Sequence, residues 1–546
     1  MDGSTSSRDR EAPLRPSRAR TINPALVCVL AASLFAFVVA SASAVSLRWI
    51  LLHPGVTGWD QIQYIDLSLK DGLTRRLDGP GALRDALFND YRWMPPGVRF
   101  LGLPLVLLHH DSNAAFRLLS LALFIVSILL VFDAGRRLSG IAAAAGAAAL
   151  VAVAPIWVRA SEEFMSETAL VPALALALWC LVRTSEPRPP RYLPVLMGAA
   201  LGFGMLAKFS FAPLAAVFLL MLGVQAWRRG SWTGLLVVLL VSALAAWPFY
   251  AYDGLRYVAY GHFAATVWPF DRMPGRGLAY ARNYVSQLAR SDFGLPALLL
   301  LPVAVALAVR GLLRGGEPAG GFGRHRFIAT ACGVMLMLTM LPHIFGHNQN
   351  ARFLVAALPV LALFLAAGSG PMLGLAMSSV AAVQALVMLG LILSGPYQAD
   401  GSDTVTGTTL LTNSFRLNPT CDFSGPIRAV RPLSVRPVVR FYGITGAINH
   451  LQIQAAFLRA GVLADVVAID TLRPDYADPA RSGADLVMVL DTPEPSSSQV
   501  EVADPDAGLG AIRDALQHSP NYARSDARVL GPAASCGMTS FLARRS

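Results

Sequence analysis

Asp60 has the type and the position of a residue that could do chemistry. It lies in the run Gly58-Trp59-Asp60-Gln61, about a dozen residues after a long apolar stretch. A carboxylate so close to a membrane surface could act as a general base on a hydroxyl group. It could also cap a helix, and Trp59 and Tyr64 could be ordinary aromatic residues of a membrane interface. From these residues alone, the catalytic and the structural roles both stay open.

A second acidic segment runs from Arg159 to Thr168 and contains Glu162, Glu163 and Glu167. Three carboxylates at the mouth of an apolar stretch could bind a sugar hydroxyl, a cation or a proton. Glu167 could equally complement the dipole at the start of a helix. The segment therefore indicates either a polar binding site or a helix start.

Two cations next to apolar stretches could hold an anion. Lys208 is one of only two lysines among 45 basic residues, and a compact ammonium group suits a phosphate, although it could instead extend to lipid headgroups. Arg352 follows His343 and His347, and its guanidinium group could bind a phosphate with two hydrogen bonds. The two histidines have the spacing of metal ligands. Because no third ligand stands next to them, we predict no metal site.

Long apolar stretches dominate the sequence and must position these side chains. Of the 546 residues, 54% are hydrophobic and only 14% are charged, which is unlike a soluble enzyme. A helix needs roughly 17–25 apolar residues to cross a bilayer. We therefore predict a polytopic α-helical membrane protein whose transmembrane domain, residues 25–394, has about eleven helices, at 25–47, 114–134, 139–157, 168–183, 192–206, 211–227, 232–250, 295–309, 327–344, 352–367 and 370–394. The first stretch is longer than the apolar core of a signal peptide, and we predict that it is a retained span.

Arginines indicate the orientation of these helices, because basic residues of short loops stay in the cytoplasm. If the stretches alternate, sixteen arginines fall on the side of the basic N-terminal tail, residues 1–24. The short loops of the other side hold only three basic residues, Arg159, Lys208 and Arg352. The N-terminus is therefore predicted inside and the C-terminus outside. The net charge of +11 is then explained mainly by the arginines that keep short loops in the cytoplasm. We therefore predict no nucleic-acid partner.

Two large external loops follow from this topology, at residues 48–113 and 251–294. Residues 97–110 are apolar, but this run is too short to span a bilayer, so we predict a helix in the outer interface. The aromatic residues of the second loop could stack on sugars or line the interface.

Residues 395–546 differ in composition from the rest of the chain. They carry 13 arginines and 15 acidic residues, whereas the preceding part has a net charge of +13. Short apolar runs at 462–469 and 484–490 alternate with helix-like stretches, which predicts an extracytoplasmic α/β domain. Cys421 and Cys536 lie near its two ends and form either a disulfide or two buried free thiols.

A series of short motifs covers about 350 residues in a fixed order. The motifs are Gly58-Trp59-Asp60-Gln61, Met94-Pro95-Pro96-Gly97, Phe116-Arg117-Leu118, Gly135-Arg136-Arg137-Leu138, Ser166-Glu167-Thr168, Leu206-Ala207-Lys208, and Arg352-Phe353-Leu354 with Pro359. Together with the predicted topology, this series resembles the GT-C glycosyltransferases. It is most similar to the branch that includes the lipid A aminoarabinose transferases and the protein O-mannosyltransferases.

The resemblance implies a GT-C fold with a soluble domain after the last span, and an inverting transferase. Asp60 would deprotonate an acceptor hydroxyl, which attacks the anomeric carbon of a polyprenyl-phosphate sugar. Lys208 and Arg352 would match positions for the lipid phosphate, and Glu167 would match the acidic position of the second outer loop. No cofactor is implied, because the reaction needs no nucleotide.

The predicted site and partners follow from these assignments. The predicted sugar- or acceptor-binding residues are Glu167, Glu163, Tyr64 and Trp59, and the predicted phosphate-binding residues are Lys208, Arg352, Arg159 and His347. The predicted partners are a polyprenyl-phosphate-linked sugar, an envelope glycan or lipid acceptor, and membrane lipids. The predicted location is the plasma membrane, in bacteria the inner membrane, with the C-terminal domain periplasmic or extracellular. Gln61 and Met94 replace residues usual in relatives, which argues against a protein acceptor.

Two other classes of function compete with this prediction. One is a transporter or lipid flippase, although charged residues are scarce inside the predicted spans and no inverted repeat is visible. The other is an envelope assembly protein without catalysis, in which the carboxylates would be dispensable.

Overall fold

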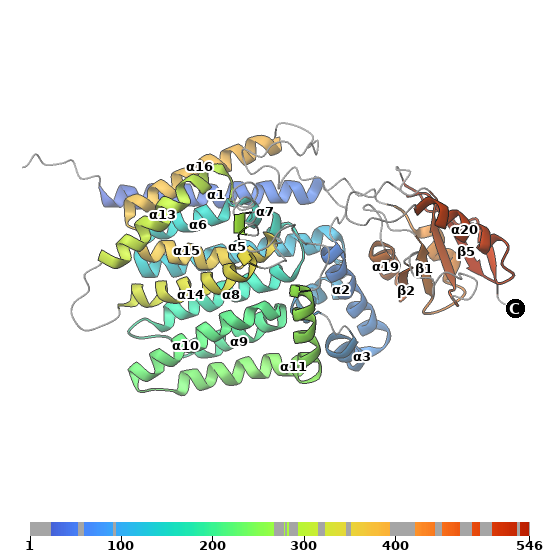
Figure 1. Ribbon diagram of the computed structural model, residues 1–546, viewed down its shortest axis with the longest axis horizontal. Helices are drawn as coiled ribbons and strands as arrows, with labels where there is room; N and C mark the ends of the chain where they lie inside the picture. Colours follow the sequence, from blue (N-terminus) through green and yellow to red (C-terminus); the bar gives the residue numbers. More distant parts are fainter. Residues whose placement is uncertain are drawn as a thin grey trace, which may run out of the picture.

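The computed structural model describes most of the membrane part and five segments of the C-terminal part. The described residues are 23–52, 59–90, 94–266, 278, 281–282, 293–314, 323–345, 351–393, 421–442, 450–469, 483–491, 505–531 and 536–544. Figure 1 shows a bundle of roughly parallel helices, a group of shorter helices across one end of it, and a mixed sheet beyond that group. The end that carries the shorter helices is called the loop end below.

Eight helices within the described ranges are long and apolar enough to cross a membrane. This confirms the predicted polytopic helical membrane protein. The helices are α1 (Pro24–Leu52), α5 (Asn113–Ser139), α8 (Ser166–Thr184), α10 (Ala212–Arg229), α11 (Thr233–Thr266), α13 (Leu295–Arg314), α14 (Arg324–Phe345) and α16 (Pro371–Leu393). Two further predicted spans are shorter apolar helices, α9 (Leu193–Ala207) and α15 (Ala357–Gly368).

The third predicted span is broken, where the sequence predicts one helix over 139–157. It consists of α6 (Ile141–Ala152) and α7 (Pro155–Ser161), which are bent by 69° from each other. Pro155 causes the break, because it lacks an N–H group and disfavours a helical residue before it. The Gln384 side chain donates to the freed carbonyl of Val153 at 2.9 Å, so the polar backbone of the break is satisfied inside the bundle.

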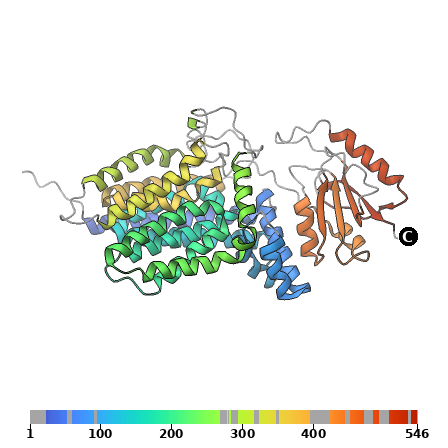
Figure 2. The same cartoon turned by 60° about the horizontal axis from the view of Figure 1, so that its bottom comes forward.

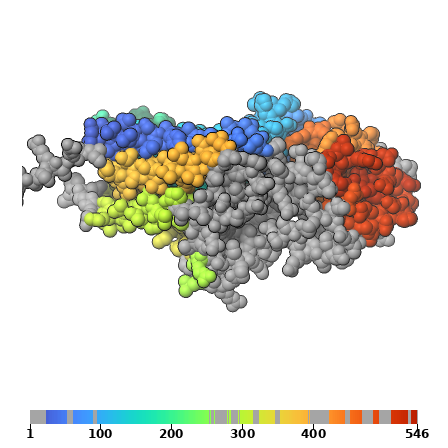
Figure 3. All heavy atoms as spheres, turned by 90° about the horizontal axis from the view of Figure 1, so that it is seen from above, coloured from blue at the N-terminus to red at the C-terminus, as the bar shows by residue number. Residues whose placement is uncertain are grey.

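The outer faces of the bundle are apolar. Along α11, Leu236, Leu240, Leu244 and Trp247 recur every three or four residues and are all exposed. A row of large exposed apolar side chains on one helix face is expected of a surface that contacts lipid. Helices α1 and α16 pack side by side on another face, as the blue and orange ridges of Figure 3 show.

Four short helices cross the loop end: α2 (Trp59–Leu77), α3 (Gly79–Asp85), η1 (Ala86–Asp90) and α4 (Gly97–Leu107). Helix α4 has 11 residues, so the apolar run at 97–110 is too short to span, as predicted. A fully buried ion pair joins two of these helices. Arg99 Nε of α4 donates to Asp71 Oδ2 of α2 at 2.8 Å, and Arg99 also donates to the Ala86 carbonyl at 2.8 Å.

The predicted loop at 251–294 does not begin where the apolar stretch ends. Helix α11 continues as far as Thr266, and Figure 1 shows its last turns pointing away from the direction of the bundle. Pro248 lies inside this helix, and a proline inside a helix is a common cause of a kink.

The described segments of the C-terminal part form a five-stranded mixed sheet with helices, which confirms the predicted α/β character. The strand order is β2-β1-β3-β5-β4, with β1 parallel to β2 and β3, and β5 antiparallel to β3 and β4. Apolar runs predicted two of these strands, and three were missed. The elements are α18 (Ser424–Val430), β1 (Val438–Tyr442), α19 (His450–Arg459), β2 (Asp465–Ile469), β3 (Leu486–Leu490), α20 (Pro505–Gln517), β4 (Tyr522–Ser525) and β5 (Met538–Ala543).

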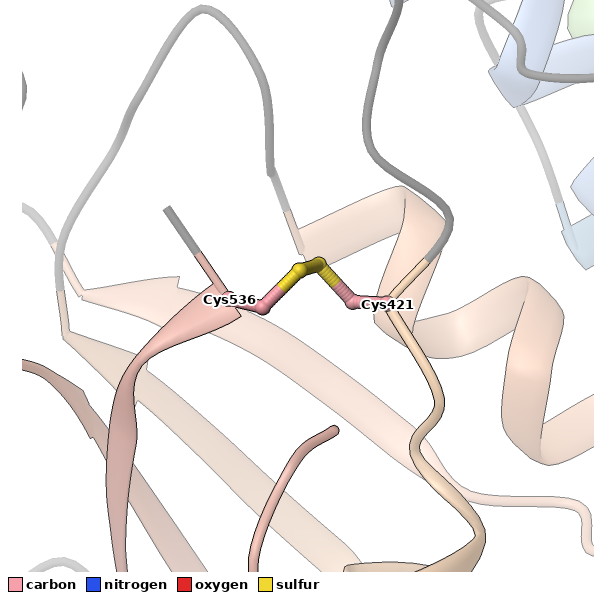
Figure 4. Close-up of a disulfide and its surroundings, with 2 residues drawn as sticks. All are labelled: Cys421 and Cys536. Carbon is pink, nitrogen blue, oxygen red and sulfur yellow. A yellow bond between two sulfur atoms is a disulfide. The ribbon is translucent and has the colours of Figure 1, made fainter. Parts of the chain in front are cut away.

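A disulfide joins the two ends of this domain. Figure 4 shows Cys421, just before α18, bonded to Cys536, just before β5. The bond closes a segment with a sequence separation of 115 residues. Of the two alternatives that the sequence left open, the structure has the disulfide, while Cys28, Cys180 and Cys332 are free.

Candidate functional site

Glu167 and Lys208 form an ion pair at the loop end of the bundle. Glu167 lies in the first turn of α8, and Lys208 follows the last residue of α9 in an extended conformation. The two helices pack against each other, which brings the start of α8 and the end of α9 together. Lys208 Nζ lies 2.7 Å from Glu167 Oε1, and the Glu167 residue is only 2% exposed.

Arg352 adds a second cation to this pair. It lies in the short 3-10 helix η4 (Ala351–Leu354), which connects the end of α14 to α15. The sequence predicted that Arg352 opens a span, but α15 begins only at Ala357. Arg352 interacts electrostatically with Glu167. Glu167 therefore pairs directly with Lys208 and is also within reach of the charge of Arg352, so that two cations act on one carboxylate.

Gly97 of the Pro-Pro-Gly motif packs against Leu206 and Ala207, the two residues before Lys208. A Cβ atom at position 97 would lie only 2.7 Å from the carbonyl oxygen of Leu206 and 2.8 Å from the backbone nitrogen of Ala207. Only glycine allows so close an approach of the start of α4 to the end of α9. Gly97 thus fixes the loop-end helices against the residues that precede Lys208.

An aromatic cluster packs around Leu206 at the end of α9. Phe249 is fully buried against Leu206, and Phe88, Phe100, Phe209 and Tyr250 pack against these two residues. The Tyr250 hydroxyl donates to the Met205 carbonyl at 2.8 Å. The residues just before Lys208, Met205 and Leu206, are therefore in contact with apolar and aromatic side chains of α11.

Asp60, the predicted general base, lies on α2. Its backbone stands in the first turn of this helix, while its side chain and that of Trp59 lie outside the described residues. Tyr64, one turn further, is buried in the hydrophobic cluster around α2 and α4. Tyr64 thus packs in the hydrophobic core, and its predicted contact with a sugar stays a prediction.

The second acidic segment mainly holds the turn between α7 and α8. Arg159 Nε lies 3.2 Å from Glu163 Oε1, four residues along the chain. Arg117 Nε donates to the Glu162 carbonyl at 2.7 Å, and the hydroxyl of Ser120 donates to the Glu163 carbonyl at 2.9 Å. Arg159 and Glu163 thus pair with each other, whereas Glu167 pairs with Lys208.

Several predicted positions lie outside the described residues. They are the whole of His347, Trp268 and Tyr280 and the side chains of His343, Tyr252, Tyr257, Tyr260 and His262. Among the residues that the structure does describe, no group of three His, Cys, Asp or Glu side chains could hold a metal ion.

Sequence reasoning did not single out Asp71 and did not predict the burial of Asp66, which it placed in the polar run after the first span. Asp71 binds Arg99, whereas Asp66 is 5% exposed and its Oδ1 atom has no hydrogen-bond partner among the residues that the structure describes. Burial raises the pKa of Asp66 well above 3.8, although the nearby charges of Arg459 and Lys70 act in the opposite direction. The sequence held a signal for the pair of Asp71 and Arg99, because Arg99 is a lone arginine in the apolar run at 97–110 and a buried arginine needs a partner.

Residues 94–251 match the family described as dolichyl-phosphate-mannose-protein mannosyltransferase. The matched segment begins at the Met94-Pro95-Pro96-Gly97 motif and contains both Glu167 and Lys208. No curated protein matches the chain.

Crystal structures of other proteins are similar to the chain at low identity. ArnT from Cupriavidus metallidurans in the apo state is 14% identical, with a TM-score of 0.45 over 93% of this chain and 97% of that protein. The same protein bound to undecaprenyl phosphate gives the same identity and coverage, with a TM-score of 0.43. The oligosaccharyltransferase of Archaeoglobus fulgidus, in complex with Zn and sulfate, is 14% identical, with a TM-score of 0.41 over 78% of this chain and 62% of that one.

Proposed function

We propose that this chain, a membrane glycosyltransferase of the GT-C superfamily, moves a sugar from a polyprenyl-phosphate donor to a hydroxyl acceptor of the cell envelope. The acceptor would be a glycolipid or a polysaccharide. The reaction would take place at the loop end of the bundle, on the outer face of the plasma membrane, and would invert the anomeric configuration.

The cluster of Lys208, Arg352 and Glu167 is the observation that carries this proposal. A polyprenyl-phosphate sugar is a phosphodiester with one negative charge, and its leaving group is a phosphate monoester that gains further negative charge. Cations fixed where this charge develops stabilise the transition state more than the bound donor. The net positive cluster at the membrane boundary is suited to this task, and Glu167 holds the Lys208 ammonium group in place.

The proposed transfer is a single displacement. The acceptor oxygen attacks the anomeric carbon and forms the new glycosidic bond, while the bond from that carbon to the phosphate oxygen breaks. The proton of the acceptor hydroxyl passes to the Asp60 carboxylate. The electron pair of the broken bond stays with the polyprenyl phosphate, beside Lys208 and Arg352. This reaction requires no nucleotide and no metal.

The apolar surroundings of Lys208 support a lipid donor. A polyprenyl chain needs an apolar surface that reaches from the phosphate into the membrane, and the aromatic cluster of Phe209, Phe249 and Tyr250 packs around Leu206, two residues before Lys208. The matched family is named for a dolichyl-phosphate sugar, and ArnT has been crystallised with undecaprenyl phosphate.

The proposed orientation follows from the arginine distribution, with the N-terminus in the cytoplasm and the C-terminal domain outside. A reporter fused after Ser546 tests it. Activity of a reporter that works only outside the cytoplasm is expected, and activity of one that works only inside would contradict it.

A donor assay tests the proposed activity. Membranes that contain the chain are given radiolabelled mannose or aminoarabinose linked to undecaprenyl phosphate, or the same sugars linked to a nucleoside diphosphate. We expect label to move to an endogenous acceptor, with one undecaprenyl phosphate released per sugar, from the lipid-linked donor alone. Transfer from the nucleotide donor only, or movement of the intact lipid across the bilayer without transfer, would refute the proposal.

A further inference from the structure

Helix α19 of the C-terminal domain has two apolar faces. Ile453 and Phe457, four residues apart, pack into the core of the sheet. Ala455 and Leu458 are only 1% and 5% exposed, yet they belong to the hydrophobic cluster of the membrane part. A helix that covers a sheet needs only one apolar face. The second face of α19 is therefore buried by something outside its own domain.

Helix α2 supplies the surface that covers this second face. Its residues Ile62, Ile65, Leu69 and Leu73 recur at helical spacing and belong to the same hydrophobic cluster as Ala455 and Leu458. Helices α19 and α2 pack against each other. Figure 2 shows α19, in orange, between α2, in blue, and the strands of the sheet.

Polar contacts fix the position of this packing. Arg459, at the end of α19, donates to the Asp111 carbonyl at 3.2 Å and to Asn113 Oδ1 at the start of α5. It also interacts electrostatically with Asp66 of α2.

An ion pair lies just beyond the C-terminal end of α2, where Arg436 lies 2.6 Å from Asp78. The C-terminal domain therefore contacts the apolar face of α2 and the residue that follows its last turn.

We infer that the C-terminal domain is a positioning module of the transferase, in which Leu458, Ala455 and Arg459 of α19 hold α2 at the loop end of the bundle. The inference rests on the proposed function for the role of Asp60, which stands in the first turn of α2. A domain docked along α2 restricts the motion of that helix and so keeps Asp60 in register with the cation cluster. A displacement of about 1 Å of a reacting group can slow an enzyme on the order of 100-fold, so such restraint matters for catalysis.

The test replaces Leu458 with glutamine in the full chain and reads out two quantities. Hydrogen–deuterium exchange of the α2 amides reports docking, and the kcat and KM of transfer from an undecaprenyl-phosphate sugar report catalysis. We expect faster exchange in α2 and a fall of kcat by about tenfold to 100-fold, with an unchanged KM for the donor. The matched control is Val467→Gln on β2, since Val467 is an apolar residue of the same domain that is 39% exposed. It is expected to change neither quantity.

A second variant guards against loss of the domain itself. Exchange of the β3 amides, from the fully buried strand Leu486–Leu490, shows whether the sheet stays folded. If Leu458→Gln unfolds it, Arg459→Gln decides the question, because it removes the contacts to Asp111 and Asn113 without touching the sheet core. Faster α2 exchange with unchanged kcat would overturn the positioning role, and unchanged α2 exchange would overturn the docking. If the wild-type chain transfers no sugar at all, the proposed function fails, while the exchange measurement still decides whether α19 holds α2.

Discussion

At the scale of single residues, the pairing of Lys208 with Glu167 is the main feature of the site. Moving either charge out of water alone is costly, so Lys208 and Glu167 depend on each other, and the charge of Arg352 further favours the Glu167 carboxylate. The arrangement keeps an ammonium group ready at a membrane boundary before any anion arrives. This fits a site that must stabilise charge on a departing phosphate.

Replacing Lys208 with glutamine tests that role. We expect kcat to fall on the order of 100- to 1,000-fold, because one of the cations that face the leaving phosphate is lost. Lys208→Arg is expected to keep part of the activity. The measurement is initial-rate transfer from an undecaprenyl-phosphate sugar, and Lys70→Gln, which changes the only other lysine, serves as the control. A Lys208→Gln variant as active as Lys70→Gln would remove Lys208 from the mechanism.

Asp66 predicts a pH dependence of stability. Its pKa in the folded chain is raised by burial, so the folded state favours the protonated carboxyl. The stability that goes with the protonated form is complete below the unfolded pKa of 3.8 and is lost as the pH rises through the higher folded value. Asp66→Asn, which cannot ionise, should therefore raise the melting temperature at neutral pH, and the gain should disappear toward pH 3.8. Thermal unfolding of the purified chain across this range measures it, with Asp85→Asn on an exposed carboxylate as the control. A lower melting temperature for Asp66→Asn at neutral pH would contradict this reading.

The sequence identified Glu167, Lys208 and Arg352 because each stands where a charge is unusual, at the boundary of an apolar stretch. It assigned Glu167 to the sugar and the two cations to the phosphate, and the ion pair between Lys208 and Glu167 was not predicted. That pair depends on how α8 and α9 pack, which no local pattern encodes. Tyr64 illustrates the same limit, since its burial follows from contacts between α2 and α4 that are distant in sequence.

At the scale of helices, backbone contact between α4 and α9 sets the shape of the site. A methyl group at position 97 has no room next to the Leu206 carbonyl. Gly97→Ala should therefore push α4 away from the end of α9, lower the stability by about 1–3 kcal/mol and reduce transfer. Gly81→Ala on α3 is the matched control, because a Cβ atom there meets no atom within 4 Å. The melting temperature and the transfer rate of both variants are measured. If Gly97→Ala matches Gly81→Ala in both quantities, the close contact between α4 and α9 is not needed.

Helix positions were largely predictable, whereas helix shapes were not. Apolar length identified the eleven predicted stretches, because lipid demands long apolar helices. The 69° break between α6 and α7 was missed, although Pro155 was visible, since a proline can also be accommodated in a continuous span. What permits the break is Gln384 on α16, more than 200 residues away in sequence, which satisfies the Val153 carbonyl.

At the scale of the whole molecule, the chain combines a membrane bundle with an α/β domain that packs on the loop end. The family match covers residues 94–251 and so agrees with the resemblance for the motifs between Met94 and Lys208. The change in composition after residue 394 predicted the C-terminal domain. For Cys421 and Cys536 the sequence left two alternatives, a disulfide or two free thiols, and the structure has the disulfide. The packing of α19 on α2 was not predicted, because the second apolar face of α19 is recognisable only once the first is seen against the sheet.

The role of Asp60 in transfer is tested most directly by Asp60→Asn in membranes supplied with an undecaprenyl-phosphate sugar. Asparagine keeps the shape of the side chain but cannot accept the proton of the acceptor hydroxyl. We expect kcat to fall by roughly 100-fold or more at normal expression, while Asp85→Asn, on an exposed carboxylate of the neighbouring helix α3, retains the wild-type rate. Transfer by Asp60→Asn at the rate of Asp85→Asn would contradict the proposed role of Asp60 as the general base.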